Sequence, residues 1–287
     1  MTLATAVFLG FVQGVAEFLP ISSSGHLAIL QNFFGMKSME SDELLLFDVL
    51  LHFATLVAVI IAYRTEIAAM LFELFRGLSA VFSKQQRRAE ADKPVPPARR
   101  LVLLIILATF PLLLALPFYH AISSLSSNSL FIGFALIVNG LILFFSDRIT
   151  IGRKNTKNAT VLDALVVGAV QAVAIIPGIS RSGSTISAGM LRGFNRSFAV
   201  KFSFLLSLPA ILGANILSFK NALETGIQSE LIPVFLAGML VAGVVGYFAI
   251  RLVNLLARKG KFGAFSYYCW AVGLITIIAS LAATPAT

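Results

Sequence analysis

Charged residues and cysteine are scarce in this sequence. Of its 287 residues only 12% are charged, and it contains one cysteine and three histidines. The single Cys269 excludes a disulfide framework and a cysteine-based metal site. Hydrophobic residues make up 58% of the chain and the mean hydropathy is +0.91, which is too apolar for a soluble domain of this length. The composition predicts an all-α membrane protein with several spans.

Basic residues outnumber acidic ones by 22 to 13, which gives a formal net charge of +9. Such a charge could suggest nucleic acid, but the cations gather in short segments between apolar runs. This distribution is typical of cytoplasmic loops, so we expect no nucleic-acid partner. Residues 1–20 lack a basic start and carry Glu17. They are therefore predicted to be a retained segment and not a cleaved signal peptide.

The apolar runs predict six transmembrane helices and two helical hairpins. Each hairpin, at 1–35 and 161–191, is interrupted by a turn rich in Ser, Pro and Gly, so its helices are too short to span a bilayer. Hairpins of this kind are predicted to be re-entrant. Residues 66–82 read as an amphipathic surface helix and 83–100 as a basic cytoplasmic loop. The predicted spans are 44–63, 101–119, 130–146, 202–219, 231–250 and 262–283.

The turn of the second hairpin, 177–185 (PGISRSGST), has the composition of a phosphate site. Arg181 can make a bidentate contact to phosphate oxygens, and glycines let backbone N–H groups approach an anion closely. A helix predicted from Ile186 would direct its N-terminus at the same anion. The alternative is a polar turn whose arginine reaches to the membrane surface. The hydroxyls predicted to bind phosphate here belong to Ser180, Ser182, Ser184 and Thr185.

The first hairpin repeats the second at a constant offset of 158 positions (Gly168 against Gly10). Paired Gln, Ser and Gly residues are not explained by apolar composition, so the chain is predicted to be an internal duplication. Between 9 and 25 the identical pairs are Gly10/Gly168, Val12/Val170, Gln13/Gln171, Val15/Val173, Ala16/Ala174, Ile21/Ile179, Ser22/Ser180, Ser24/Ser182 and Gly25/Gly183.

The order of these elements predicts that the two repeats have opposite orientations. If basic loops are cytoplasmic, three spans separate the hairpins, which then enter the membrane from opposite faces and meet near its midplane. The predicted units of this single membrane domain are 1–157 and 158–287, each with one hairpin and three spans, and both termini lie outside.

The two hairpins differ at positions where chemistry could use the difference. Glu17, Ser23 and His26 of the first stand where the second has Ile175, Arg181 and Ser184. A carboxylate and an imidazole thus come from one half and a cation from the other. Gln13 lies one helical turn before Glu17, and Asp48 and His52 share a face of the next helix. Glu17 could bind a divalent cation, with Gln13, or transfer protons.

Two long motifs carry a resemblance to a known family. Residues 13–26 (QGVAEFLPISSSGH) and 177–185 are similar to the signature motifs of bacterial undecaprenyl-diphosphate phosphatases of the bacitracin-resistance type. The resemblance continues through 47–52 (FDVLLH) and 203–206 (SFLL) and covers nearly the whole chain.

The resemblance implies hydrolysis of undecaprenyl diphosphate to undecaprenyl phosphate and orthophosphate, which recycles a lipid carrier for peptidoglycan synthesis. It also implies bacitracin tolerance, the bacterial inner membrane, a site open to the periplasm, and a divalent cation such as Mg²⁺ or Ca²⁺. Substrate lipid and membrane lipids are the expected partners, and a homodimer is considered. Because Gln13 replaces an acid, a two-carboxylate metal site is not expected. The family's functional positions fall on Glu17, Ser22, Ser23, His26, Ser180, Arg181, Ser182 and Thr185.

Several mechanisms fit these residues. Catalytic roles are predicted for Glu17, Ser23, His26 and Arg181, and Ser22 and Ser24 join the second hairpin's hydroxyls in binding the diphosphate. The nucleophile is Ser23 with His26 as base, His26 itself, or water activated by His26. A different class, a prenyl-phosphate transporter or flippase, also fits inverted repeats with broken helices. Release of orthophosphate without a membrane gradient distinguishes the enzyme from a transporter.

Overall fold

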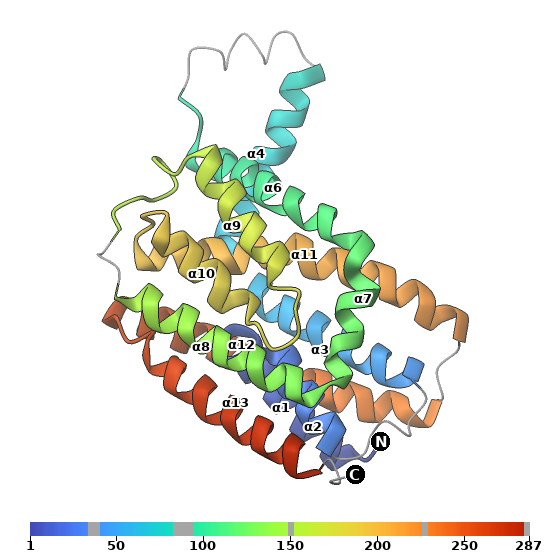
Figure 1. Ribbon diagram of the computed structural model, residues 1–287. Helices are drawn as coiled ribbons and strands as arrows, with labels where there is room; N and C mark the ends of the chain where they lie inside the picture. The colour runs from blue at the N-terminus through green and yellow to red at the C-terminus, as the bar shows by residue number, and fades with distance from the viewer. Residues whose placement is uncertain (34–40, 83–93, 149–151, 226–228, 284–287) are drawn as a thin grey trace.

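The structure, a computed structural model, describes residues 1–33, 41–82, 94–148, 152–225 and 229–283 (Figure 1). Apart from one isolated β-bridge, its regular elements in these ranges are helices. The α-helices are α1 (Leu3–Phe18), α2 (Ser23–Phe33), α3 (Ser41–Ala62), α4 (Arg64–Phe82), α6 (Pro97–Ala115), α7 (Tyr119–Ser123), α8 (Ser129–Asp147), α9 (Val161–Val173), α10 (Arg181–Leu191), α11 (Arg196–Thr225), α12 (Ile232–Lys259) and α13 (Ala264–Ala283); the 3₁₀ turns are η2 (Leu116–Phe118), η3 (Ser124–Ser127) and η4 (Ser229–Leu231).

Six of these helices are long and apolar enough to cross a membrane, as the sequence predicts. They belong to α3, α6 with η2, α8, α11, η4 with α12, and α13. Many of their large apolar side chains are exposed on the outside of the bundle, where a soluble protein would carry charge. The chain is therefore built as a multi-pass integral membrane protein.

Helix boundaries differ from the predicted ones at both hairpin turns. The helix predicted from Ile186 begins earlier, at Arg181, as α10, and in the first hairpin α2 begins at Ser23, inside the Ser-rich turn. The physical reason is N-capping: the Ser22 hydroxyl accepts a hydrogen bond from Gly25 N (3.2 Å) and the Ser180 hydroxyl from Gly183 N (3.1 Å). The polar residues from Arg181 to Thr185 thus lie in the first turns of a helix.

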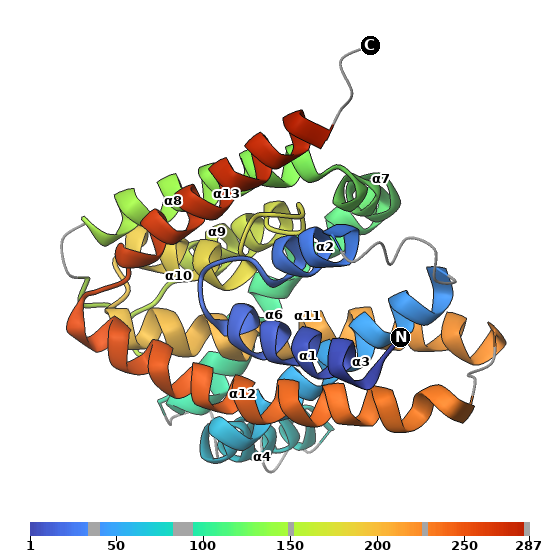
Figure 2. The same ribbon diagram turned by 90° about the horizontal axis from the view of Figure 1, so that it is seen from below.

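Close helix contacts place each hairpin against the opposite half of the chain. α1 packs along α12, and α9 packs along α6. At Gly10 an added Cβ would overlap the backbone carbonyl of Gly238, and at Gly168 it would overlap that of Ala108. The paired glycines of the duplication therefore let the backbones approach at equivalent contacts. Figure 2 shows α1 beside α12, and α8 beside α13.

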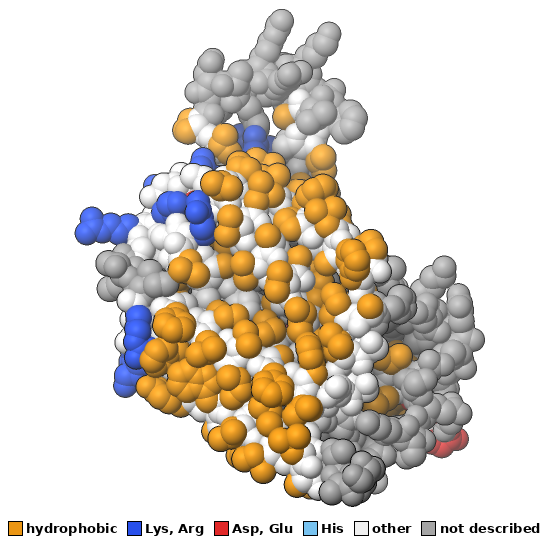
Figure 3. Space-filling view, in the orientation of Figure 1, with side chains coloured by type: hydrophobic (Ala, Val, Ile, Leu, Met, Phe, Trp, Pro, Cys, Tyr) orange, Lys and Arg blue, Asp and Glu red, His pale blue; other side chains and the backbone are white. Residues whose placement is uncertain are grey.

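Basic residues gather at one end of the bundle, and apolar side chains cover the adjoining face (Figure 3). Buried Asp163 connects two segments at that end, because it forms ion pairs with Lys154 Nζ and Arg192 Nε, each at 2.8 Å. Burial alone would raise its pKa, but hydrogen bonds from Lys154, Thr160 and Arg192 lower the pKa to about 2. The loop before α9 is thereby tied to the end of α10.

The predicted surface helix 66–82 corresponds to α4, whereas the predicted basic loop 83–100 is partly wrong. Residues 83–93 lie outside the described residues, but α6 begins at Pro97 and includes Arg99 and Arg100. Proline is favoured at the first position of a helix, since its fixed φ suits the helix and its missing N–H would have no partner there. Arg99 pairs with Glu73 of α4 at 3.0 Å, so this segment is ordered by tertiary contacts.

Candidate active site

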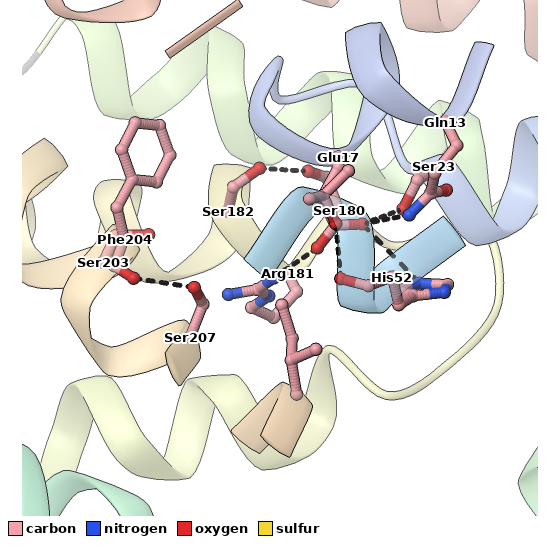
Figure 4. A network of polar contacts seen from close by, with 12 residues as sticks. Gln13, Glu17, Ser23, His52, Ser180, Arg181, Ser182, Ser203, Phe204 and Ser207 are labelled. Atoms are coloured by element: carbon pink, nitrogen blue, oxygen red, sulfur yellow. Dashed lines mark hydrogen bonds and ion pairs between the residues drawn. The ribbon is translucent and has the colours of Figure 1, made fainter. Parts of the chain in front are cut away.

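The buried carboxylate of Glu17 is the centre of a polar cluster (Figure 4). Its Oε2 accepts hydrogen bonds from Ser23 Oγ at 2.7 Å and from Gln13 Nε2 at 3.1 Å. Its Oε1 accepts one from Arg181 Nη2, which makes a charged pair between the two hairpins. The acid and the arginine that the sequence assigns to different halves are therefore in direct contact.

Local structure explains how the first hairpin delivers these groups. Gln13 and Glu17 lie one turn apart on the same face of α1, whose last residue is Phe18. The chain then reverses through Ser22, which has a left-handed φ of 72° and is the one non-glycine residue with positive φ among those described. This conformation is costly for serine. It puts the start of α2, and with it Ser23, directly beside Glu17.

The turns of the two hairpins touch each other through small residues. A Cβ added at Gly25 would lie 3.0 Å from Gly178 Cα, and one added at Gly183 would lie 3.0 Å from Pro20 Cβ. Gly178 and Pro20 are themselves 158 positions apart, so the two contacts are equivalent in the duplication. The predicted meeting of the two turns is present in the structure.

Asn139 of α8 forms hydrogen bonds with both turns, and it was not among the predicted site residues. Its Oδ1 accepts a hydrogen bond from Ser180 N at 3.0 Å, and its Nδ2 donates to Pro20 O at 2.9 Å. The side chain is fully buried. The sequence signal that could have identified Asn139 is a polar amide inside an apolar span. Polar side chains are rare in such spans unless they have a hydrogen-bond partner.

His26 lies outside the hydrogen-bonded cluster around Glu17. Its Nδ1 donates to Ser22 O at 2.8 Å, so in the neutral ring Nε2 accepts from the Tyr268 hydroxyl at 2.9 Å. The two rings are stacked with centroids 5.6 Å apart. Ser23 donates to Glu17 and not to His26, so the predicted pairing of Ser23 with His26 is not formed here.

His52 of α3, in contrast, reaches the cluster. Its Nδ1 donates to Asp48 O at 2.7 Å, and its Nε2 lies 3.6 Å from Glu17 Oε2. Because Nδ1 carries the proton that is donated to the carbonyl, Nε2 is the ring nitrogen that faces the Glu17 carboxylate. Sequence analysis noted the Asp48 and His52 pair, but its position opposite Glu17 depends on how α3 packs.

The remaining predicted phosphate ligands differ in what they contact. Ser22 and Ser180 are helix caps, and Ser182 Oγ donates to Leu19 O at 3.4 Å. The Thr185 hydroxyl shares a hydrogen bond of 2.6 Å with Ser203 of α11, which sequence analysis did not assign to the site. Ser24 is exposed, with its hydroxyl 3.5 Å from that of Ser22.

Besides both polar side-chain atoms of Gln171 in α9, three buried polar atoms of the two hairpins have no hydrogen-bond partner within the described residues. They are Arg181 Nη1, Ser184 Oγ and Gln13 Oε1. Buried polar groups are normally satisfied, so atoms of this kind are expected where a ligand or water binds. A phosphate would suit the two donors, and a cation would suit the amide oxygen.

A divalent cation would find few protein ligands at this site. Among the described residues there is no group of three His, Cys, Asp or Glu side chains that could hold a metal. Glu17 and the unpartnered oxygen of Gln13 are the available donors. Mg²⁺ commonly binds through one or two carboxylates together with substrate phosphates and water, and this small donor set suits that arrangement.

Fold and site together define a multi-pass helical membrane protein in which an acid, a serine and an arginine from two hairpins form one buried polar site. Residues 6–275 match the family described as Bacitracin resistance protein BacA, and the chain belongs to that family. The predicted family is thus confirmed.

Curated relatives align with nearly the whole chain. A protein of Alkaliphilus metalliredigens is 40% identical over 98% of this chain and 100% of its own length, and one of Carboxydothermus hydrogenoformans is 43% identical over 95% of each. A Methanobrevibacter smithii protein is 38% identical over 98% of this chain and 99% of its own. Each of the three is named undecaprenyl-diphosphatase.

Proposed function

We propose that this protein hydrolyses undecaprenyl diphosphate to undecaprenyl phosphate and orthophosphate, and so recycles the lipid carrier used in peptidoglycan synthesis. The observation that carries the proposal is the Glu17, Ser23 and Arg181 cluster, with an unpartnered Arg181 nitrogen beside it, in a family whose relatives carry the name of this activity. Bacitracin tolerance follows as the family's expected trait.

The diphosphate would be bound by Arg181 and by hydroxyl and backbone donors of α10. Arg181 Nη1 and Ser184 Oγ are free to donate, and the N-terminus of α10 favours an anion. Serving as a phosphate ligand would draw the guanidinium away from Glu17. Glu17 Oε1 would then be free of the guanidinium, while Oε2 stays in contact with Ser23.

Ser23 is the nucleophile that these contacts favour. Its oxygen would attack the terminal phosphorus while its proton passes to Glu17, the acceptor 2.7 Å away. The bond from phosphorus to the bridging oxygen breaks, and the lipid monophosphate leaves. Water then hydrolyses the phosphoserine to release orthophosphate and restore Ser23. His26 as nucleophile or base stays a prediction, and either role requires its Nε2 to leave the Tyr268 hydroxyl.

We also propose that a divalent cation, Mg²⁺ or Ca²⁺, assists the reaction. When bound it would neutralise phosphate charge and stabilise the charge that develops in the transition state. The residues that would hold it are Glu17 and Gln13. Because they supply few donors, its affinity should depend strongly on the presence of diphosphate.

The membrane arrangement we propose is an inverted repeat with two re-entrant hairpins in the bacterial plasma membrane. It is supported by the equivalent contacts of α1 with α12 and α9 with α6, and by the equivalent contacts between the two turns. α1 begins and α13 ends away from the basic end (Figures 1 and 2). If that basic end is cytoplasmic, the first hairpin enters from the periplasm and the site opens there.

The decisive experiment measures orthophosphate released from undecaprenyl diphosphate by the purified protein in detergent, with and without a chelator. Turnover without any membrane gradient is expected, with loss on chelation and recovery on adding Mg²⁺ or Ca²⁺. Binding of the lipid with no phosphate release would contradict the enzyme and favour the transporter considered from sequence. Full turnover in chelator would remove the cation from the proposal but leave hydrolysis standing.

A further inference from the structure

A polar cavity lies at the basic end, where α3 passes into α4 and both meet α11 and α12. Its volume is about 280 Å³, and no member of the Glu17 cluster lines it. It therefore has no part in the hydrolysis proposed above. The residues around it are Ala62, Tyr63, Arg64, Glu66, Lys201, Tyr247, Ile250, Arg251, Asn254 and Arg258.

Positive charge is in excess in this cavity. Lys201 Nζ donates to Glu66 Oε1 at 2.7 Å, which pairs the cavity's single acid with one of its four cations. Burial would raise the pKa of Glu66, but hydrogen bonds from Lys201 and Thr65 hold it below its usual value. Glu66 is thus ionised at neutral pH, and its negative charge neutralises the positive charge of Lys201.

Three guanidinium groups remain, those of Arg64, Arg251 and Arg258. Within the described part of the chain none of them forms an ion pair with a carboxylate. Arg251 Nη2 donates to the Tyr247 hydroxyl at 2.5 Å. Three cations around one concavity favour an anion with several oxygens, and phosphate fits guanidinium geometry well.

Neutral donors complete the cavity wall. Asn254 Nδ2 donates to the Tyr63 hydroxyl at 2.9 Å, which leaves the hydroxyl's own proton available to a ligand. Burial raises the pKa of Tyr63 to about 12, so that proton is retained at neutral pH. A phosphate would therefore meet a hydroxyl donor as well as charge.

Apolar side chains beside the cavity indicate a lipid and not a free ion. On α12, Phe248 precedes Arg251 by three residues and Leu255 follows it by four, so both lie on the same side of the helix as Arg251. Both are exposed. An inorganic phosphate would not use this apolar surface, whereas acyl chains would cover it.

We propose that this cavity binds the phosphate headgroup of an anionic phospholipid, with the acyl chains lying against α12. Basic pockets between transmembrane helices at a cytoplasmic surface are suited to such headgroups. The bound lipid would bridge α4 to α12 at the basic end and stabilise the packing of these helices there.

Native mass spectrometry of the full-length protein tests this proposal. The protein is stripped of lipid in neutral detergent and titrated with phosphatidylglycerol or with zwitterionic phosphatidylcholine. We expect one phosphatidylglycerol to bind in preference to phosphatidylcholine. The double variant Arg251→Gln/Arg258→Gln should weaken this binding at least about tenfold, since a single charge-assisted hydrogen bond is worth roughly that factor.

The matched control is Lys259→Gln/Lys261→Gln, which removes the same charge at the same end but changes no residue lining the cavity. It should bind phosphatidylglycerol as the wild type does. Equal weakening in both double variants would show diffuse attraction and overturn the proposal. So would equal binding of the two lipids, or displacement of phosphatidylglycerol by an equal concentration of inorganic phosphate. Retained orthophosphate release in both variants shows that they are folded.

Discussion

At the residue scale, Glu17 takes its polar partners from four helices. Gln13 belongs to its own helix, Ser23 to α2, His52 to α3 and Arg181 to α10. A buried carboxylate is unfavourable unless it is paired and hydrogen-bonded, and here every oxygen is. The pairing holds the acid in place in the free enzyme, and an incoming phosphate can compete for the same arginine.

Replacing Arg181 should therefore slow the reaction and also destabilise the fold. For Arg181→Ala we expect kcat/KM for phosphate release to fall by about 10²–10³, because a donor to the developing phosphate charge is lost. Arg181→Lys keeps the charge but loses the bidentate geometry of the guanidinium. Its kcat/KM should lie between those of the wild type and Arg181→Ala. The control is Arg148→Ala, an exposed arginine stacked over Phe144.

This prediction needs a folding check, since removing one partner of a buried ion pair costs about 3–5 kcal/mol. Glu17→Gln in the Arg181→Ala background removes the unpaired charge and should recover the thermal stability but not the activity. Wild-type turnover by Arg181→Ala would exclude the arginine from the site.

Neighbouring serines offer a matched test of the nucleophile. Ser23 donates to Glu17, whereas Ser24 is exposed and its hydroxyl lies 3.5 Å from that of Ser22. Ser23→Ala should abolish orthophosphate release and the phosphoserine detectable by mass spectrometry after acid quench, while Ser24→Ala should keep both. If Ser23→Ala were active and His26→Gln inactive, the nucleophile would be the His26 imidazole or water and not Ser23.

At the scale of elements, the repeated residues have structural duties that the sequence could not separate from binding. Ser22 and Ser180 were predicted as phosphate ligands, and in the structure their hydroxyls cap α2 and α10. Gly25 and Gly183 supply the capped N–H groups and let the turns approach. What is shared between the repeats thus builds the hairpins, and what differs, Glu17 and Arg181 above all, provides the chemistry.

Helix approach through the paired glycines can be tested by adding a methyl group. Gly10→Ala and Gly168→Ala would each press a Cβ into a backbone carbonyl of the packed helix, and overpacking of this kind costs about 1–3 kcal/mol. Both variants should unfold at a lower temperature in detergent than the wild type.

The control for this pair is Gly213→Ala on α11, where an added Cβ meets nothing within 4 Å. Alanine favours a helix over glycine by about 1 kcal/mol, so this variant should be unchanged or slightly stabilised. If all three variants unfolded alike, close helix approach would not be the reason for the glycines.

At the scale of the whole molecule, the proposed topology follows from where the charges lie. Lys157 precedes α9 at the basic end, and Ser127 lies in η3 before α8. Both residues are exposed, while native Cys269 is fully buried and should not react. In intact cells an impermeant maleimide should label Ser127→Cys, and it should label Lys157→Cys only after lysis. The reverse pattern would invert the topology and the opening of the site. The homodimer considered from sequence stays a prediction.

The sequence by itself determined the six apolar spans and the two similar segments that carry Glu17 and Arg181, because hydropathy and an offset of 158 positions can be read along the chain. Only the tertiary structure decided that His52 faces Glu17, that His26 binds Tyr268, and that Asn139 joins the two turns. These contacts link positions far apart in the chain. They depend on how helices rotate and pack against one another, which periodicity within any single helix does not specify.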